Sequence, residues 1–194
     1  MTMTVLELET RKLAHSTVAR TASIAAVALV VLTSISGYAA SRLDPASPLA
    51  AKAAFLVRAP GWPGYVGLAA MSVGVVMLLA TGILVAWSFG REFTDGTVVG
   101  LFALPPSPLT TACAKTAALL AWVVAMSSVC SLLVAAGGVA LGLPASDLWS
   151  ALVSVWTVAV LLGISALPVG WVSTVGRGYL AGIAAALGIV VVAN

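Results

Sequence analysis

The sequence predicts an all-α integral membrane protein, and two observations support this fold class. Of the 194 residues, 61% are hydrophobic and only 8% are charged, whereas soluble domains are about 45–50% apolar and about 25% charged. The charges also divide the chain into long uncharged stretches, each comparable to the roughly 20 apolar residues that a membrane-spanning helix needs. Because so few charged residues cannot solvate the surface of a soluble protein, we expect residues 1–194 to form a single transmembrane domain.

About five uncharged stretches have the length of a membrane span. A bilayer core about 30 Å thick requires about 17–25 helical residues, and the last stretch barely reaches that length. The fourth contains Pro168, which removes a helix hydrogen bond and predicts a kink. A cleaved signal peptide is the less favoured interpretation of the first stretch, because acidic residues precede it and its apolar part is too long. The predicted spans are residues 21–40, 65–89, 111–137, 148–169 and 177–194.

The positions of Lys and Arg predict the orientation. With a cytoplasmic N-terminus, six of the nine basic residues lie on the cytoplasmic side and three lie opposite, as the positive-inside rule favours. We therefore expect a multi-pass protein of the cell membrane with its N-terminus in the cytoplasm. The net charge is only +3, and no basic cluster exceeds Arg11-Lys12, so nothing in the sequence indicates a nucleic-acid partner.

Residues 4–18 are predicted to form an interfacial helix before the first span. Glu7 and Arg11 are four residues apart, and Glu9 and Lys12 are three apart; both spacings allow ion pairs that support a helix. The alternative interpretation is a loosely structured polar segment that leads into the membrane.

The segment between the second and third spans, residues 87–108, is unusually polar. Placing Arg91, Glu92 and Asp95 at the bilayer centre would cost about 2.5–3.5 kcal/mol for each residue, so we expect this segment in water or at the interface. Helical spacing from residue 93 to 104 gathers the less polar residues on one face. That face comprises Phe93, Thr97, Gly100, Leu101 and Leu104.

Proline residues mark the end of this predicted helix and the start of the next. Pro105 and Pro106 should end it, because the residue before a proline is disfavoured in the α conformation. Ser107 then fits as the N-cap of the third span, with Pro108 at its first helical position. An amphipathic helix held between two spans either lies in the headgroup layer or is bound by a soluble partner, and its sequence alone leaves both open.

The run Arg91-Glu92-Phe93, followed by Gly96-Thr97, Leu104-Pro105 and Lys115, resembles the ABC-2 type permeases, the membrane subunits of bacterial ABC exporters. The segment "LELETRKLAHS" similarly resembles the interfacial helix of that family. The resemblance implies that residues 91–104 are a cytoplasmic coupling helix that docks on an ATP-binding cassette subunit. It also implies a second permease subunit in a homo- or heterodimer.

The resemblance also implies roles for individual residues at this coupling site. Glu92 would be a charged contact or a structural clasp, and Lys115 would lie at the headgroups or pair with the loop acids. The other implied site residues are Arg91 and Asp95 beside Glu92, Phe93 as an apolar anchor, Gly96 for close approach, Thr97 for capping or packing, Leu101 on the apolar face and Pro105 at the helix end.

This sequence departs from the family pattern in one respect. Family members usually have six spans, with re-entrant helices before the sixth, and we predict about five. Either a sixth span is missing from this chain or the protein is a shortened variant.

Glycine pairs and aromatic residues suggest where the spans pack and end. Gly138 and Gly142, and likewise Gly178 and Gly182, are spaced for close helix packing. Packing within the chain is the preferred interpretation, and a dimer contact is the alternative. Trp62 and Tyr65 are expected in the aromatic belt at the membrane surface.

Other classes of function fit the sequence less well. An ion-coupled transporter or channel usually carries ionisable residues within its spans, whereas these fall at predicted span boundaries. An enzyme needs converging acids, bases or metal ligands, and the only histidine, His15, has no ligand-like partner spacing. We therefore predict neither a catalytic nor a metal site.

The sequence thus predicts the permease subunit of an ABC-2 type exporter of lipidic, peptidic or drug-like substrates. It contains no phosphate-binding P-loop motif, so we expect no cofactor on this chain, with ATP and Mg²⁺ bound by the partner subunit. Membrane lipid is the other expected partner. The alternative is a non-transporting membrane protein, with an immunity, structural or regulatory role and no ATPase partner.

Overall fold

The structure, a computed structural model, describes residues 2–43, 47–97, 100 and 107–193, and these contain helices and no strand. This confirms the predicted all-α membrane fold. The described residues group into two compact units, which we treat separately: unit 1 (Met1–Ile24, Leu78–Ala125 and Gly163–Asn194) and unit 2 (Ala25–Met77 and Met126–Leu162). The elements are α1 (Thr2–His15), α2 (Thr17–Val31), η1 (Leu32–Ser36), α3 (Gly37–Ala40), α4 (Pro48–Leu56), α5 (Gly61–Thr94), α7 (Pro108–Ala140), η2 (Ala145–Asp147), α8 (Leu148–Ser165), α9 (Val169–Val175) and α10 (Tyr179–Ala193).

Within the described part of the chain, four helical segments are long and apolar enough to cross a membrane: Thr17–Ala40, Gly61–Thr94, Pro108–Ala140 and Ala145–Val175. They correspond to the first four predicted spans. The fifth predicted span becomes α10, which has 15 residues and is about 22 Å long at 1.5 Å per residue. That length is less than the bilayer core of about 30 Å.

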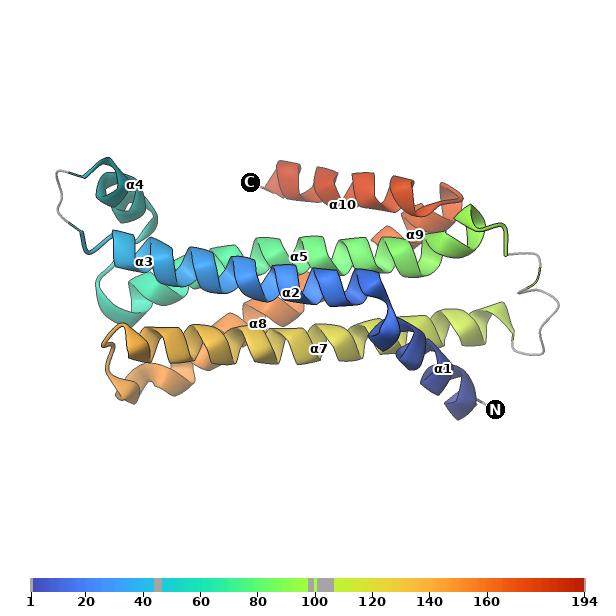
Figure 1. Ribbon diagram of the computed structural model, residues 1–194, viewed down its shortest axis with the longest axis horizontal. Helices are drawn as coiled ribbons and strands as arrows, with labels where there is room; N and C mark the ends of the chain where they lie inside the picture. Colours follow the sequence, from blue (N-terminus) through green and yellow to red (C-terminus); the bar gives the residue numbers. More distant parts are fainter. Residues whose placement is uncertain (1, 44–46, 98–99, 101–106, 194) are drawn as a thin grey trace. The chain divides into compact units, whose positions relative to one another are not determined.

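Ser16 separates α1 from α2 (Figure 1). Its hydroxyl donates to the Leu13 carbonyl at 2.9 Å and accepts the Ala19 N–H at 2.9 Å. The first contact satisfies a carbonyl at the end of α1, and the second is an N-cap for α2. The two predicted ion pairs of α1 form, with Glu7–Arg11 at 2.8 Å and Glu9–Lys12 at 2.7 Å.

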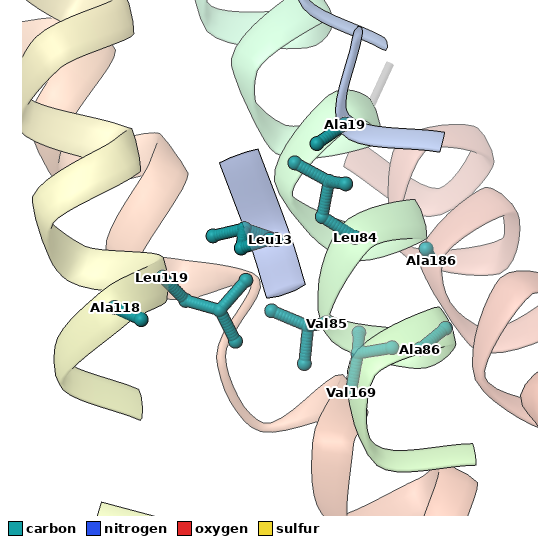
Figure 2. Close-up of a cluster of buried hydrophobic side chains, with 9 residues drawn as sticks. All are labelled: Leu13, Ala19, Leu84, Val85, Ala86, Ala118, Leu119, Val169 and Ala186. Atoms are coloured by element: carbon teal, nitrogen blue, oxygen red, sulfur yellow. The ribbon is translucent and has the colours of Figure 1, made fainter. Parts of the chain in front are cut away.

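The core of unit 1 is built from small and medium apolar side chains of six helices (Figure 2). In lipid, helices associate through close van der Waals packing rather than through a difference in hydrophobicity, so shape fit decides which residues meet here. Leu13 brings α1 into this core, and the helix before the first span is thereby tied to the spans. The cluster comprises Leu13, Ala19, Leu84, Val85, Ala86, Ala118, Leu119, Val169 and Ala186.

Helices α5 and α10 approach closely in unit 1 (Figure 1). A Cβ added at Gly90 would lie 2.3 Å from the Tyr179 nitrogen, and one added at Gly82 would lie 2.6 Å from the Ala186 Cβ. The facing residues follow in antiparallel order at steps of four, and we call this contact the α5–α10 seam. Its pairs are Gly82 with Ala186, Ala86 with Gly182, and Gly90 with Gly178.

The core of unit 2 contains three aromatic rings. Trp62 is 4% exposed and Tyr65 is fully buried, and the expected level of both rings at the membrane surface stays a prediction. The Trp62 indole donates to the Pro144 carbonyl at 2.7 Å, and the Tyr65 hydroxyl donates to the Val134 carbonyl at 2.9 Å. Because each ring satisfies its polar atom on a backbone carbonyl, both rings can pack inside the unit. The third ring, Tyr38, lies edge-on to Tyr65, with 5.2 Å between centroids.

The two glycines of the first predicted packing pair have different environments. A Cβ at Gly138 would lie 2.5 Å from the Trp62 ring, whereas one at Gly142 would meet nothing within 4 Å. Gly142 instead has a φ of +83° and ends α7, with its N–H bonded to the Val139 carbonyl and the Leu143 N–H bonded to the Gly138 carbonyl. This is a Schellman cap, so the packing role expected of Gly142 does not match its described surroundings.

The predicted kink at Pro168 is a break between two helices. Helix α8 ends at Ser165, and α9 begins directly after the proline. Proline cannot donate a backbone hydrogen bond, and tighter three-residue bonds, such as that from the Ala166 N–H to the Gly163 carbonyl at 3.2 Å, carry the chain through the turn.

Candidate functional site

The predicted coupling helix does not begin at Arg91. Residues 91–94 form the last turn of α5, which continues without interruption from the second span. After Pro63 in its first turn, α5 contains no proline. The helix ends only where Gly96 adopts a φ of +69°, a conformation that glycine tolerates best. Residues 98–99 and 101–106 are outside the described part of the chain, and they include the predicted site residues Leu101 and Pro105.

Gly96 and Thr97 complete the end of α5. The Gly96 N–H bonds to the Phe93 carbonyl at 3.3 Å, and the Thr97 hydroxyl donates to the Glu92 carbonyl at 3.4 Å. Both contacts satisfy carbonyls that the helix end would otherwise leave unpaired. A Cβ at Gly96 would meet nothing within 4 Å, so the described contacts explain this glycine by its backbone conformation rather than by close approach.

Helix α7 begins on the other side of this loop with the predicted cap. The Ser107 hydroxyl accepts the Thr110 N–H at 3.2 Å, and Pro108 is the first residue of the helix. This arrangement confirms the N-cap and the proline position expected from the sequence. Two turns further on, α7 presents Lys115 to α5.

Lys115 joins the start of α7 to the end of α5 inside unit 1. Its ammonium group lies 2.5 Å from the Glu92 carboxylate and donates to the Ser88 carbonyl at 2.9 Å. The Lys115 side chain is 4% exposed and that of Glu92 is 13% exposed. We call the contact between these two side chains the Glu92–Lys115 clasp.

The clasp is an ion pair largely shielded from water. A buried charge is tolerated only when it is paired and hydrogen-bonded, and both conditions are met here for Lys115. The Phe89 ring lies on the same side, with its centroid 5.9 Å from the ammonium nitrogen, and adds a weak cation–π attraction. Since removing either partner would leave the other charge buried, the clasp holds the two helix ends together as one structural element.

The remaining predicted site residues lie around the clasp. The Arg91 guanidinium stacks over Trp87 at 4.7 Å from the ring centroid, and Phe93 is half-buried. Asp95, Gly96 and Thr97 are exposed. The carboxylate of Asp95 and the hydroxyl of Thr97 are therefore exposed to solvent in the residues that follow the buried Glu92–Lys115 clasp.

Three contributors to this region were not predicted from the sequence. Ser88 acts through its backbone carbonyl, which no side-chain pattern reveals. Trp87 and Phe89 contact cations, and the four-residue spacing from Trp87 to Arg91 was a usable signal for one of these contacts. The second predicted glycine pair is better placed than the first, because Gly182 packs against Ala86.

The described chain has long apolar helices joined by short polar segments, and Glu92 pairs with Lys115 at the base of one of these segments. These features define the chain as a polytopic α-helical membrane protein. The family model for "ABC-2 family transporter protein" matches residues 5–193. The chain therefore belongs to the ABC-2 transporter family. Neither the curated proteins nor the solved structures yield a match.

Membership of this family places the chain among the membrane subunits of ABC transporters, which are permeases rather than enzymes. Such permeases generally work with an ATP-binding subunit. Across the residues that the structure describes, no group of three or more His, Cys, Asp or Glu side chains could hold a metal ion.

Proposed function

We propose that this chain is the permease subunit of an ABC exporter in the cell membrane, with its N-terminus in the cytoplasm. A separate ATP-binding cassette subunit binds ATP and Mg²⁺ and docks on the loop between α5 and α7. Two permease subunits form the transport unit. The substrate is lipidic, peptidic or drug-like, since the spans are overwhelmingly apolar.

The observation that supports this proposal best is the Glu92–Lys115 clasp at the base of the loop. A force applied to a loose loop would be absorbed by the loop itself. Here the buried ion pair fastens the C-terminal end of α5 to the N-terminal part of α7, so displacement of the loop moves both spans together. We therefore assign Glu92 to the structural clasp and the exposed Asp95 to the contact with the partner.

Length supports the same assignment. Helices α5 and α7 contain 34 and 33 residues, or about 50 Å each, and the bilayer core accounts for about 30 Å. Both helices therefore extend beyond the hydrocarbon. Arg91 lies in the last turn of α5 and the exposed Asp95 directly after it, where a soluble subunit can reach them.

The proposal predicts that an Asp95→Asn variant loses affinity for the ATP-binding subunit. Loss of one exposed carboxylate from a charge-assisted contact should weaken binding by about tenfold. The fold should be unaffected, because no described side chain pairs with Asp95. The measurement is co-purification from native membranes in mild detergent, with the captured subunit identified by its P-loop sequence and quantified by mass spectrometry.

The matched control is Asp147→Asn, which removes one exposed carboxylate from η2, outside the coupling site. It should retain the ATP-binding subunit at the wild-type level. A Phe93→Ala variant tests the apolar part of the contact and should reduce capture while the protein still inserts normally. Capture of no P-loop protein by the wild type, in detergent that preserves another ABC exporter, would favour the non-transporting alternative.

A further inference from the structure

Unit 2 contains a pocket of about 410 Å³ where the chain passes from α3 through α4 to α5. Its polar lining comes from Tyr38, Ser41, Arg42 and Arg58. None of its lining residues, all of which the structure describes, is acidic, so the described pocket is basic. Arginine is the side chain best suited to phosphate, because its planar guanidinium donates several hydrogen bonds.

The first arginine is held in place. Arg42 donates to the Leu141 carbonyl at 2.7 Å and to the Tyr38 hydroxyl at 3.4 Å, and its guanidinium stacks over the Tyr38 ring at 4.7 Å. These contacts use two of its five N–H groups. The Arg42 guanidinium is therefore fixed at the pocket, none of these contacts with described residues is to an acidic group, and N–H groups remain for a ligand.

The second arginine lies between two pockets. Arg58 is exposed and lines both the basic pocket and a neighbouring one of about 270 Å³. Ala59 also lines both, so the two spaces adjoin. Among the described residues, no ion-pair or hydrogen-bond partner is recorded for Arg58, which leaves its charge available to a ligand.

The neighbouring pocket is an apolar groove along the first turns of α5. Besides Arg58 and Ala59, its lining is Leu56, Pro63, Gly64, Gly67 and Met71. A Cβ added at Gly67 would meet nothing within 4 Å, and Met71 is 55% exposed. Gly67 therefore leaves an open apolar groove beside Arg58, whereas Gly64 packs against the Ala59 carbonyl. The groove lies on a helix long and apolar enough to span the membrane.

Helix α4 places these pockets at the membrane surface. It carries exposed Leu49, Phe55 and Leu56 beside the exposed Lys52. Apolar side chains interspersed with a cation are typical of a segment that lies among lipid headgroups. The basic pocket thus lies at headgroup level, and the groove points along a span.

We propose that the paired pockets are a binding site for one anionic phospholipid. Its phosphate is bound by Arg42 and Arg58, and one acyl chain lies in the groove formed by Gly64, Gly67 and Met71. A soluble phosphate would use the arginines but leave the groove empty, so the combination favours a lipid. The site lies wholly within unit 2 and is independent of the coupling proposed for the loop after α5.

The test is native mass spectrometry of the purified full chain, titrated in detergent with phosphatidylglycerol and separately with zwitterionic phosphatidylcholine. Arg58→Gln should weaken phosphatidylglycerol binding by about tenfold and affect phosphatidylcholine much less. Lys52→Gln is the matched control, because it removes a cation from the same segment but lines neither pocket, and it should bind as the wild type does.

A second variant tests the groove without changing the charge. Gly67→Leu fits the open space at that position and fills the groove, so it should also weaken phosphatidylglycerol binding. Equal losses from Arg58→Gln and Lys52→Gln would show a diffuse charge effect and overturn the proposal. So would normal binding by Gly67→Leu together with displacement of the lipid by glycerol 3-phosphate, since that result would indicate a site for a soluble anion.

Discussion

Lys115 is the residue on which the proposed coupling depends most. It is a lysine buried near the start of a membrane-spanning helix, and its charge is matched by Glu92 and by the Ser88 carbonyl. Buried ion pairs often add little net stability over apolar replacements of the same size, but losing one partner is costly. This asymmetry distinguishes a clasp from an incidental contact.

We expect Glu92→Gln or Lys115→Met alone to destabilise the protein by about 3–5 kcal/mol, because each leaves an unpaired buried charge or acceptor. The double variant should recover much of that loss. The measurement is the thermal unfolding transition in detergent. Arg11→Met, which breaks an exposed pair with Glu7, is the control and should cost at most about 1 kcal/mol. Additive losses in the double variant would show that the two residues act independently.

At the scale of single residues, the sequence predicts the position of a residue along the chain better than its contacts. It leaves two roles open for Lys115, and only the fold places its ammonium group beside Glu92. Gly142 shows the reverse case, since its spacing from Gly138 suggests packing whereas its φ of +83° assigns it to a helix end. Spacing along one chain does not say which helix lies opposite.

Among the elements, α10 depends on the α5–α10 seam for its position. Gly82, Ala86 and Gly90 form one face of α5, and Gly178, Gly182 and Ala186 provide the matching face. Small residues allow the two backbones to approach closely, and close approach is the main source of helix association in lipid. The sequence reveals the glycines but not this pairing, because the pairing depends on the tertiary fold.

Gly90→Ala should loosen the seam, because the new methyl group would lie 2.3 Å from the Tyr179 nitrogen. Hydrogen–deuterium exchange of residues 179–187 should become faster than in the wild type. Gly188→Ala is the matched control, since a Cβ there meets nothing within 4 Å and alanine favours the helix; its exchange should be unchanged or slower. Unchanged exchange in Gly90→Ala would show that the seam does not hold α10.

Element boundaries were predictable where local chemistry sets them. Ser107 and Pro108 start α7, and Pro168 separates α8 from α9, because capping and proline act over a few residues. The start of a helix at Arg91 was wrongly predicted, since charge alone does not end a helix and α5 continues to Thr94. The actual end depends on Gly96, whose positive φ was not anticipated.

For the molecule as a whole, the proposed orientation has a direct chemical test in its two cysteines. Cys113 is exposed on α7, two residues before Lys115, and Cys130 is buried further along the same helix. With the N-terminus in the cytoplasm, Cys113 lies at the cytoplasmic membrane surface.

A membrane-impermeant maleimide should therefore label the wild-type protein in inside-out vesicles and not in intact spheroplasts. Cys113→Ser should abolish the labelling, whereas Cys130→Ser should leave it unchanged. The readout is the mass shift of the protein. Labelling of Cys113 in spheroplasts would reverse the orientation and place the loop after α5 outside the cell, where no ATP-binding subunit could reach it.

The spacing of the seam restricts how α10 can travel. Its small residues recur every four positions on both helices, so a slide of one or two residues would push larger side chains into backbone. The next register that aligns the small residues is a full step of four residues away, about 6 Å, and it keeps two of the three small pairs. The shapes of the two facing surfaces therefore oppose a continuous sliding of α10 along α5. In the transport cycle that we propose, α10 is therefore expected to move with α5 as a rigid pair or to leave it in one discrete step.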